Sequence, residues 1–148
     1  MQISAQRLLV VEDDVTVGRA LSRTLARRGF SVAVVRSCTA ARTLAQPFDF
    51  AILDLDLPDG NGVDLARQLL AAGKMPSVMF FTSSCDPVLL AQARRLGPVV
   101  NKAAGTGPIL SLLAPDSIEP PQSRTAPSTK ARSVRASSSS ALRKSRAR

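Results

Sequence analysis

Residues 50–65 read FAILDLDLPDGNGVDL, and the fold class is decided by this stretch. Its first four residues are all apolar, which is typical of a strand buried on both faces of a parallel sheet. The apolar run stops at Asp54, and Asp56, Asp59 and Asp64 follow. An isolated carboxylate is costly to bury, so each of these groups needs a cation, a proton or water. Acids placed directly after a buried strand therefore indicate a functional site at the end of that strand.

Similar apolar runs recur between residues 7 and 113, and segments with helical spacing separate them. We expect strands at residues 7–11, 31–35, 50–53, 77–81 and 99–100. Strands that alternate with helices predict βα units joined by right-handed crossovers. The predicted fold is therefore an α/β domain with a five-stranded parallel sheet in the flavodoxin-like order 2-1-3-4-5 and helices on both faces.

Helix boundaries can also be predicted from the sequence. Asp14 suits the N-cap of the first helix, which should stop near Gly29, while Asp86 and Pro87 suit the start of the fourth. Gly73 lies just past the expected end of the third helix. The expected apolar faces of four helices are Val17, Leu21 and Leu25; Val63, Ala66, Leu69 and Leu70; Leu89, Ala93 and Leu96; and Ile109, Leu112 and Leu113.

The composition changes near residue 115, so we expect a domain over residues 5–114 and a disordered tail over residues 115–148. The tail is rich in Ser, Pro, Ala and Arg, and it has too few large apolar residues to offset its ordering entropy. The net charge of +9 is concentrated there, because residues 120–148 carry 8 Lys or Arg and no acid. The tail is either a solvating extension without a partner, an electrostatic attachment to nucleic acid or an acidic partner, or sequence that follows a truncated gene.

Several function classes are excluded by composition. The chain has no His, which excludes His-based triads and histidine metal sites. Cys38 and Cys85 lack metal-like spacing, and we expect them to be free thiols. The chain has neither an apolar run of membrane-spanning length nor a secretory signal, so we expect no membrane association and a cytoplasmic protein.

Polar residues follow every predicted strand at the edge where an open α/β sheet carries its functional groups, although Arg36 and Ser37 after the second strand form no obvious site. Glu12 and Asp13 follow the first strand, Asp54 the third, Thr82 the fourth and Lys102 the fifth. Strands 1 and 3 are neighbours in the predicted order, so their carboxylates should converge, and converging carboxylates need a cation. Mg²⁺ suits oxygen ligands and neutralises phosphoryl oxygens. Asp54 then becomes a candidate nucleophile that forms an acyl phosphate.

Four motifs in this order, VVEDD, LDLDLPDGNG, FFTSS and VNKA, resemble the receiver domain of two-component response regulators. The spacing of Asp54, Pro58 and Gly62 is similar to the Asp-x-x-x-Pro-x-x-x-Gly loop of that family. The resemblance covers roughly residues 5–113. It implies that Asp54 is the phosphoacceptor and that a sensor histidine kinase or histidine phosphotransfer protein is the donor.

The resemblance also implies roles for the other strand-end residues. Glu12 and Asp13 match the acidic pair that holds Mg²⁺, with Asp13 the more direct ligand, and Asp56 matches the position whose backbone carbonyl binds the metal. Thr82 matches the switch hydroxyl, and Lys102 matches the family's invariant lysine. The protein would be no conventional enzyme, because it would catalyse only its own phosphotransfer and dephosphorylation.

Two positions depart from the family pattern. Val99 stands where the family usually has an aromatic residue, and Ala103 stands where it usually has proline. In the family these positions belong to the coupling between phosphorylation and output, so the resemblance implies an altered or degenerate output face around the fourth helix, fifth strand and fifth helix. We expect a stand-alone receiver that signals to another protein. The alternatives are a phosphorylation-independent scaffold that binds through its tail, and nucleic-acid binding as the main function with the domain as its regulator.

A second family shares one motif. Asp54-Leu55-Asp56 after an apolar strand is similar to the Asp-x-Asp loop of haloacid dehalogenase-like phosphatases. That family usually carries the motif on its first strand, with Thr or Val at the position that Pro58 occupies here. The receiver resemblance rests on four motifs, so we favour it.

Overall fold

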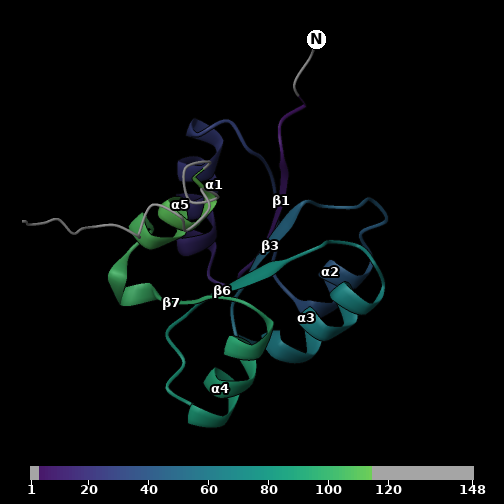
Figure 1. Ribbon diagram of the computed structural model, residues 1–148, viewed down its shortest axis with the longest axis vertical. Coiled ribbons are helices and arrows are strands. Elements are labelled where there is room, and N and C mark those ends of the chain that lie inside the picture. The colour runs from purple at the N-terminus through teal and green to yellow at the C-terminus, as the bar shows by residue number, and fades with distance from the viewer. Residues whose placement is uncertain (1–3, 115–148) are drawn as a thin grey trace, which may run out of the picture. The chain divides into compact units, whose positions relative to one another are not determined.

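The computed structural model describes residues 4–114, and its centre is a parallel sheet of five strands. The strands are β1 (Arg7–Val11), β2 (Ser31–Val35), β3 (Phe50–Leu53), β6 (Val78–Thr82) and β7 (Val99–Asn101). Their order across the sheet is β2-β1-β3-β6-β7, which confirms the predicted flavodoxin-like order (Figure 1). The two edges of the sheet are therefore β2 and β7.

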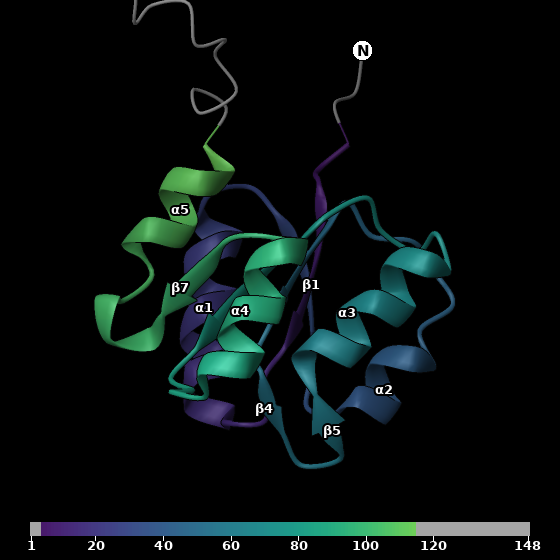
Figure 2. The ribbon, with the colours of Figure 1, turned by 60° about the horizontal axis from the view of Figure 1, so that its bottom comes forward.

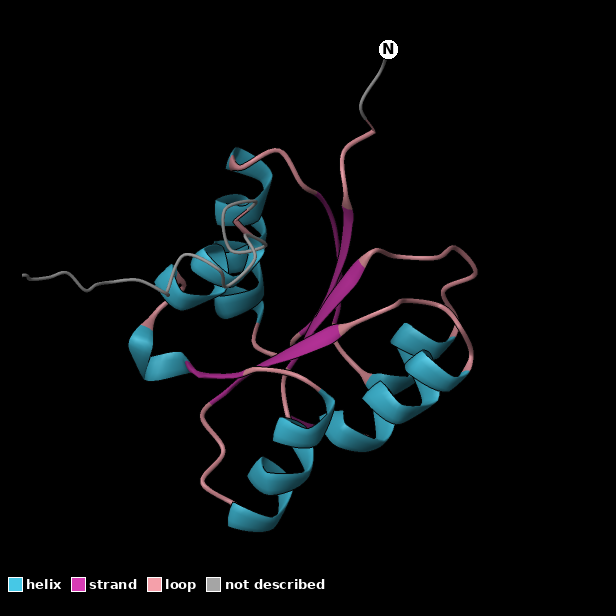
Figure 3. Ribbon diagram, viewed as in Figure 1, coloured by secondary structure: helices cyan, strands magenta, loops and turns pink. Residues whose placement is uncertain are grey.

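Helices cover both faces of the sheet (Figure 3). On one face lie α1 (Val15–Arg27) and α5 (Gly107–Leu113); on the other lie α2 (Cys38–Arg42), α3 (Gly62–Ala71) and α4 (Pro87–Leu96). A short 3₁₀ helix, η1 (Lys102–Ala104), follows β7. Because side chains alternate along a strand, each strand feeds two cores: Leu8 and Val10 pack with the α1 side, while Leu9 and Val11 pack with the α2–α4 side.

Some details of the prediction differ from the structure. Leu112, expected on the apolar face of the fifth helix, is 45% exposed. The strand predicted at residues 77–81, β6, starts and ends one residue later, and β7 ends at Asn101 rather than at residue 100. Thr82 pairs with Asn101, and this pair extends the ladder. The loop after Asp54, where we predicted no strand, holds a small antiparallel hairpin of β4 (Asp56–Leu57) and β5 (Gly60–Asn61) (Figure 2). Pairs of two residues escape detection by periodicity, since they contain only one alternation of faces.

The predicted helix caps are confirmed. The carboxylate of Asp14 accepts hydrogen bonds from the backbone N–H groups of Thr16 and Val17, at 2.8 and 3.1 Å. Asp86 caps α4 in the same way, and Pro87 is the first residue of that helix. These caps fix where α1 and α4 begin after β1 and β6, and they leave the residues between strand and helix at the functional edge of the sheet.

Asp59 lies in the turn of this hairpin and anchors the hairpin to α2. Its two oxygens accept hydrogen bonds from the N–H groups of Cys38 and Thr39, at 2.8 and 2.9 Å, and from the Thr39 hydroxyl at 2.7 Å. These hydrogen bonds hold the pKa of Asp59 well below its ordinary value. The bond from the Thr39 hydroxyl has the largest effect, and the bonds from the two N–H groups add to it. The loop after the phosphoacceptor candidate is thereby tied to the second βα unit.

We expect this anchor to survive acidification. The pKa of Asp59 is lower in the folded protein than in the unfolded chain. Its contribution to stability is therefore fully present at a pH above the unfolded-state pKa, and it is lost only as the pH falls through the folded-state pKa. The Thr39 amide should therefore keep its NMR shift through about pH 4, where an ordinary aspartate is half protonated. Asp59→Asn should move that shift at neutral pH and make it insensitive to pH. A Thr39 amide that titrates like a free aspartate in the wild type would contradict the prediction.

Among the helices of residues 4–114, none combines the length and the apolar character that crossing a membrane requires. The compact unit that contains the sheet ends at Leu113. The tail predicted for residues 115–148 lies outside the described residues, so its predicted disorder stays a prediction. Both cysteines are free thiols, Cys38 buried and Cys85 exposed.

Candidate functional site

The register of the sheet brings Glu12 and Asp54 to the same level. Val11 of β1 lies opposite Leu53 of β3, so the residue that follows each strand leaves the sheet at its carboxyl edge. The backbone N–H of Glu12 donates to the carbonyl of Val35 and that of Asp54 to the carbonyl of Val11, both at 3.0 Å. Because both peptide groups are held by neighbouring strands, the sheet itself fixes the positions of the two acids.

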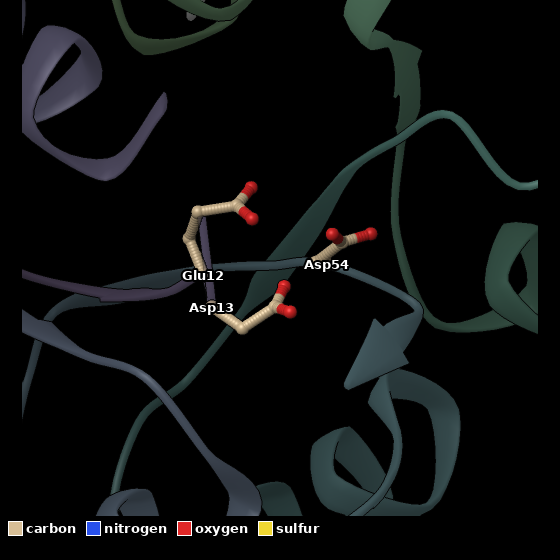
Figure 4. Close-up of side chains that lie close together, drawn as sticks. All are labelled: Glu12, Asp13 and Asp54. Atoms are coloured by element: carbon tan, nitrogen blue, oxygen red, sulfur yellow. The ribbon is translucent and has the colours of Figure 1, made fainter. Parts of the chain in front are cut away.

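The predicted convergence of carboxylates is present. Oxygens of Glu12, Asp13 and Asp54 lie within 4.8 Å of one another (Figure 4). Only 3% of Glu12 and 6% of Asp54 is exposed, whereas Asp13 is exposed. The cluster thus has two buried acids and a third at its mouth, where a ligand can approach from solvent.

Lys102 bridges the two buried acids. Its Nζ lies 2.7 Å from Glu12 Oε2 and 2.7 Å from Asp54 Oδ2. Burial opposes the charge on Lys102, but hydrogen bonds to Asp54 and Glu12 outweigh it and raise the lysine pKa. Burial also raises the pKa of Glu12, and the hydrogen bond from Lys102 offsets part of that rise. With all four groups charged, one ammonium among three carboxylates leaves two negative charges, which suits a divalent cation.

The carboxylate of Asp54 is held in a fixed orientation. Its Oδ1 accepts the N–H of Leu55 at 2.7 Å and, more weakly, that of Asp56 at 3.4 Å, while Oδ2 faces Lys102. Backbone donors such as Leu55 leave no trace in the sequence, because every residue except proline carries the same N–H.

Gly62 explains the spacing of the loop. A Cβ at this position would overlap the carbonyl oxygen of Asp54, and the Gly62 N–H donates to the carbonyl of Leu55 at 2.9 Å. The first turn of α3 therefore packs directly against the backbone of the phosphoacceptor candidate, which only a residue without a side chain permits. The Asp-x-x-x-Pro-x-x-x-Gly spacing is the signal for this contact in the sequence.

The other predicted site residues lie at the same edge without joining the acidic cluster. Thr82 ends β6 and is buried, and its hydroxyl accepts the N–H of Ser84 at 3.1 Å. Asp56 begins the hairpin with an exposed side chain outside the cluster. The switch role of Thr82 and the metal role of the Asp56 carbonyl stay predictions.

The residues present fit Mg²⁺. Three carboxylates supply hard oxygen donors, and the ion typically takes one or two protein carboxylates and keeps several waters. The exposed position of Asp13 leaves room on the solvent side for those waters or for phosphoryl oxygens. Glu12, Asp13 and Asp54 would hold the ion.

The sequence of this chain is similar to those of known response regulators. The family model for the response regulator receiver domain matches residues 8–102. The DNA-binding response regulator MtrA of Mycobacterium tuberculosis is 39% identical over 90 residues, which cover 60% of this chain and 39% of that protein. The probable transcriptional regulatory protein SilR of Salmonella typhimurium is 39% identical over 79 residues, covering 52% of this chain and 35% of that protein. The chain thus spans about two fifths of the length of the curated relatives it matches.

Solved structures show the same fold. The receiver domain of HemR from Leptospira biflexa is 31% identical, with a TM-score of 0.66 over 73% of this chain and 90% of that one. TrrA of Thermotoga maritima, solved in complex with Mg²⁺ and a beryllium fluoride, has a TM-score of 0.65 over 73% of this chain and 96% of that one; at 18% identity it supports the fold alone. In this family the phosphoacceptor is an aspartate and Mg²⁺ binds in the acidic pocket. From its matched residues, its strand order and its acidic site, the chain belongs to the response regulator receiver domain family of two-component systems.

Proposed function

We propose that this chain accepts a phosphoryl group on Asp54 from the phosphohistidine of a sensor histidine kinase or a histidine phosphotransfer protein. The observation that carries the proposal is the buried, oriented carboxylate of Asp54, which lies beside two further acids and is paired with Lys102. In the transfer, the phosphorus–nitrogen bond of the donor breaks and a bond forms between phosphorus and an Asp54 oxygen. The leaving imidazole takes up a proton.

The surrounding residues would each serve one part of this transfer. Glu12, Asp13, Asp54 and the backbone carbonyl of Asp56 would hold Mg²⁺, which supplies charge neutralisation for the phosphoryl oxygens. Lys102 would turn its ammonium from the Asp54 carboxylate toward a phosphoryl oxygen, and the Thr82 hydroxyl would bind another. Such preorganised donors stabilise the charge that spreads over the transferring group.

The proposal makes the protein a phosphoacceptor, with catalysis limited to its own phosphotransfer and dephosphorylation. Its signal would be the lifetime of the aspartyl phosphate, read by a downstream protein that binds the phosphorylated surface. A cytoplasmic location is part of the proposal, since the donor and Mg²⁺ would meet the chain there.

We expect intact-mass spectrometry to detect one added phosphoryl group after incubation with Mg²⁺ and acetyl phosphate. EDTA should prevent the addition, and Asp54→Ala should abolish it because the proposed acceptor oxygen belongs to Asp54. Asp64→Ala, which removes an exposed acid in the first turn of α3, is the matched control and should label like the wild type. Equal labelling of the wild type and Asp54→Ala would sink the proposal.

A second candidate is a receiver that acts as a scaffold without phosphorylation, and Val99 favours it. This residue is partly buried against the core on the α4 side, so its short branched side chain fills a packing position. In that case the wild type would stay unlabelled with every donor. The basic tail would then be the candidate contact with nucleic acid or an acidic partner; deletion of residues 116–148 should weaken such binding, and the loss should be largest at low salt.

A further inference from the structure

A groove of about 470 Å³ runs between α1 and the edge strand β2, beside the acidic site. Val15 and Val34 contribute apolar surface to it, and each is 40% exposed. Arg19 and Arg23 of α1 and Arg36 after β2 contribute guanidinium groups. The groove thus combines exposed apolar surface with a concentration of positive charge.

Within residues 4–114, the outer edge of β2 has backbone N–H and C=O groups that pair with no other strand. Ser31 donates its N–H to the carbonyl of Gln6, and the carbonyl of Val35 accepts the N–H of Glu12, so both residues face β1. Successive residues of a parallel strand face opposite sides, so the N–H and C=O groups of Val32 and Val34 point away from the sheet. In residues 4–114, β2 pairs with β1 alone. This edge is a template for one further strand.

The segment of chain that contains α1 and β2 carries basic residues and no acidic ones. Residues 15–48 contain six arginines and no acid. Arg19 and Arg23 lie four residues apart on α1, which places them on the same face of the helix. All three groove arginines are exposed, and the ion pairs within residues 4–114 use only Arg67 and Lys102 as cations. The guanidinium groups of the groove therefore have no carboxylate partner in the described part of the chain.

The two acids that line the groove are already engaged. Glu12 is paired with Lys102, and Asp14 caps α1. Val11 pairs with Val35, so Glu12 and Arg36 leave the sheet at the same end of the groove, and Arg19 and Arg23 lie further along α1. The spacing of these charges favours a ligand that carries its own charges at defined positions along its length.

We propose that the α1–β2 groove binds an extended acidic segment of a partner protein, which adds to β2 as a sixth strand. Main-chain hydrogen bonds to Val32 and Val34 supply affinity, and alternate side chains of the segment face α1. Acidic side chains at those positions meet Arg19, Arg23 and Arg36, whose planar guanidinium groups bind carboxylates in a bidentate manner. A small anion would use the arginines and leave both the strand edge and Val34 uncovered. The proposal does not depend on phosphorylation of Asp54.

The probe is a short synthetic peptide of alternating valine and glutamate, labelled for fluorescence anisotropy and titrated at low salt against the full chain. It places all its acids on one face of the added strand. We expect binding, together with slower amide hydrogen exchange at Val32 and Val34. Replacement of glutamate by glutamine in the peptide should weaken binding about tenfold or more, since it removes the charge-assisted hydrogen bonds.

The matched protein variants separate this groove from general charge attraction. Arg19→Gln, Arg23→Gln and Arg36→Gln combined should weaken peptide binding about tenfold. Arg94→Gln with Arg95→Gln, on the exposed end of α4, should leave it within about twofold. All five arginines are exposed, so both variants should unfold at the wild-type temperature.

Three results would overturn the proposal. The first is no binding of the peptide, and the second is binding without slower exchange at Val32 and Val34. The third is complete displacement of the peptide by inorganic pyrophosphate at a comparable concentration, which would assign the groove to a small anion.

Discussion

Lys102→Met is expected to lower the free energy of unfolding by about 1–3 kcal/mol in EDTA. The substitution leaves Glu12 and Asp54 buried without the ammonium that lies 2.7 Å from each. Removing one partner of a fully buried ion pair costs about 3–5 kcal/mol, and the value here should be smaller because 18% of the Lys102 side chain is exposed. Urea unfolding in EDTA measures the difference.

Mg²⁺ should then stabilise the variant more than the wild type. Without the Lys102 ammonium, no positive side chain of residues 4–114 neutralises the three carboxylates, so they should bind Mg²⁺ more tightly. The stability that Mg²⁺ adds grows with the ratio of the Mg²⁺ concentration to its Kd. Labelling of Asp54 should still slow by about 10²-fold, since one donor to the phosphoryl oxygens is lost. Mg²⁺ would therefore restore the stability of Lys102→Met but would not restore its rate of phosphotransfer.

Arg67→Met is the control for Lys102→Met, because it also removes one cation from an ion pair. The Arg67–Asp64 pair is exposed at 3.4 Å, and such pairs contribute about 0–1 kcal/mol. A Lys102→Met protein that unfolds like Arg67→Met in EDTA, and gains no more from Mg²⁺ than the wild type, would show that Lys102 does not compensate the acidic cluster.

The fold could be predicted because its strands carry an unambiguous signal. Every residue of β6 is buried, and a continuous apolar run of that length between turn residues is typical of a strand in the middle of a parallel sheet. The apolar pattern is a poorer guide at the end of the strand. Thr82 is polar, so the pattern places it after β6. Its pairing with Asn101 nevertheless makes it part of the strand. Strand boundaries depend on partners that are distant in sequence, and composition does not record them.

The acidic cluster could be predicted for a similar reason, whereas its internal contacts could not. Glu12 and Asp54 follow apolar strands that are neighbours in the sheet, so topology alone brings them together. The anchor formed by Asp59 escapes prediction, because an acid in a turn looks the same whether or not a helix 20 residues earlier supplies its donors. The pairing of Lys102 with Glu12 as well as Asp54 depends on side-chain reach across the sheet, which residue order does not specify.

Gly62→Ala should impair phosphotransfer more than its cost in stability accounts for. The new methyl group would overlap the carbonyl oxygen of Asp54, and since that oxygen belongs to the backbone, no change of rotamer relieves the overlap. Overpacking of this kind costs about 1–3 kcal/mol. The methyl group would displace Asp54, whose carboxylate must align with the phosphodonor. A displacement of about 1 Å can slow a reaction 10²-fold.

Gly97→Ala provides the matched control. A Cβ at Gly97 would overlap the carbonyl oxygen of Val78 just as closely, but Val78 is the first residue of β6, at the opposite end of the strand from Thr82. Both variants should lose similar stability in urea, so comparison at equal folded fraction separates damage to the fold from damage to the site. We expect Gly97→Ala to label with acetyl phosphate nearly as fast as the wild type and Gly62→Ala about 10²-fold more slowly. Equal rates in the two variants would mean that the packing of α3 against Asp54 serves stability alone, and the glycine of the loop would then have no part in positioning the phosphoacceptor.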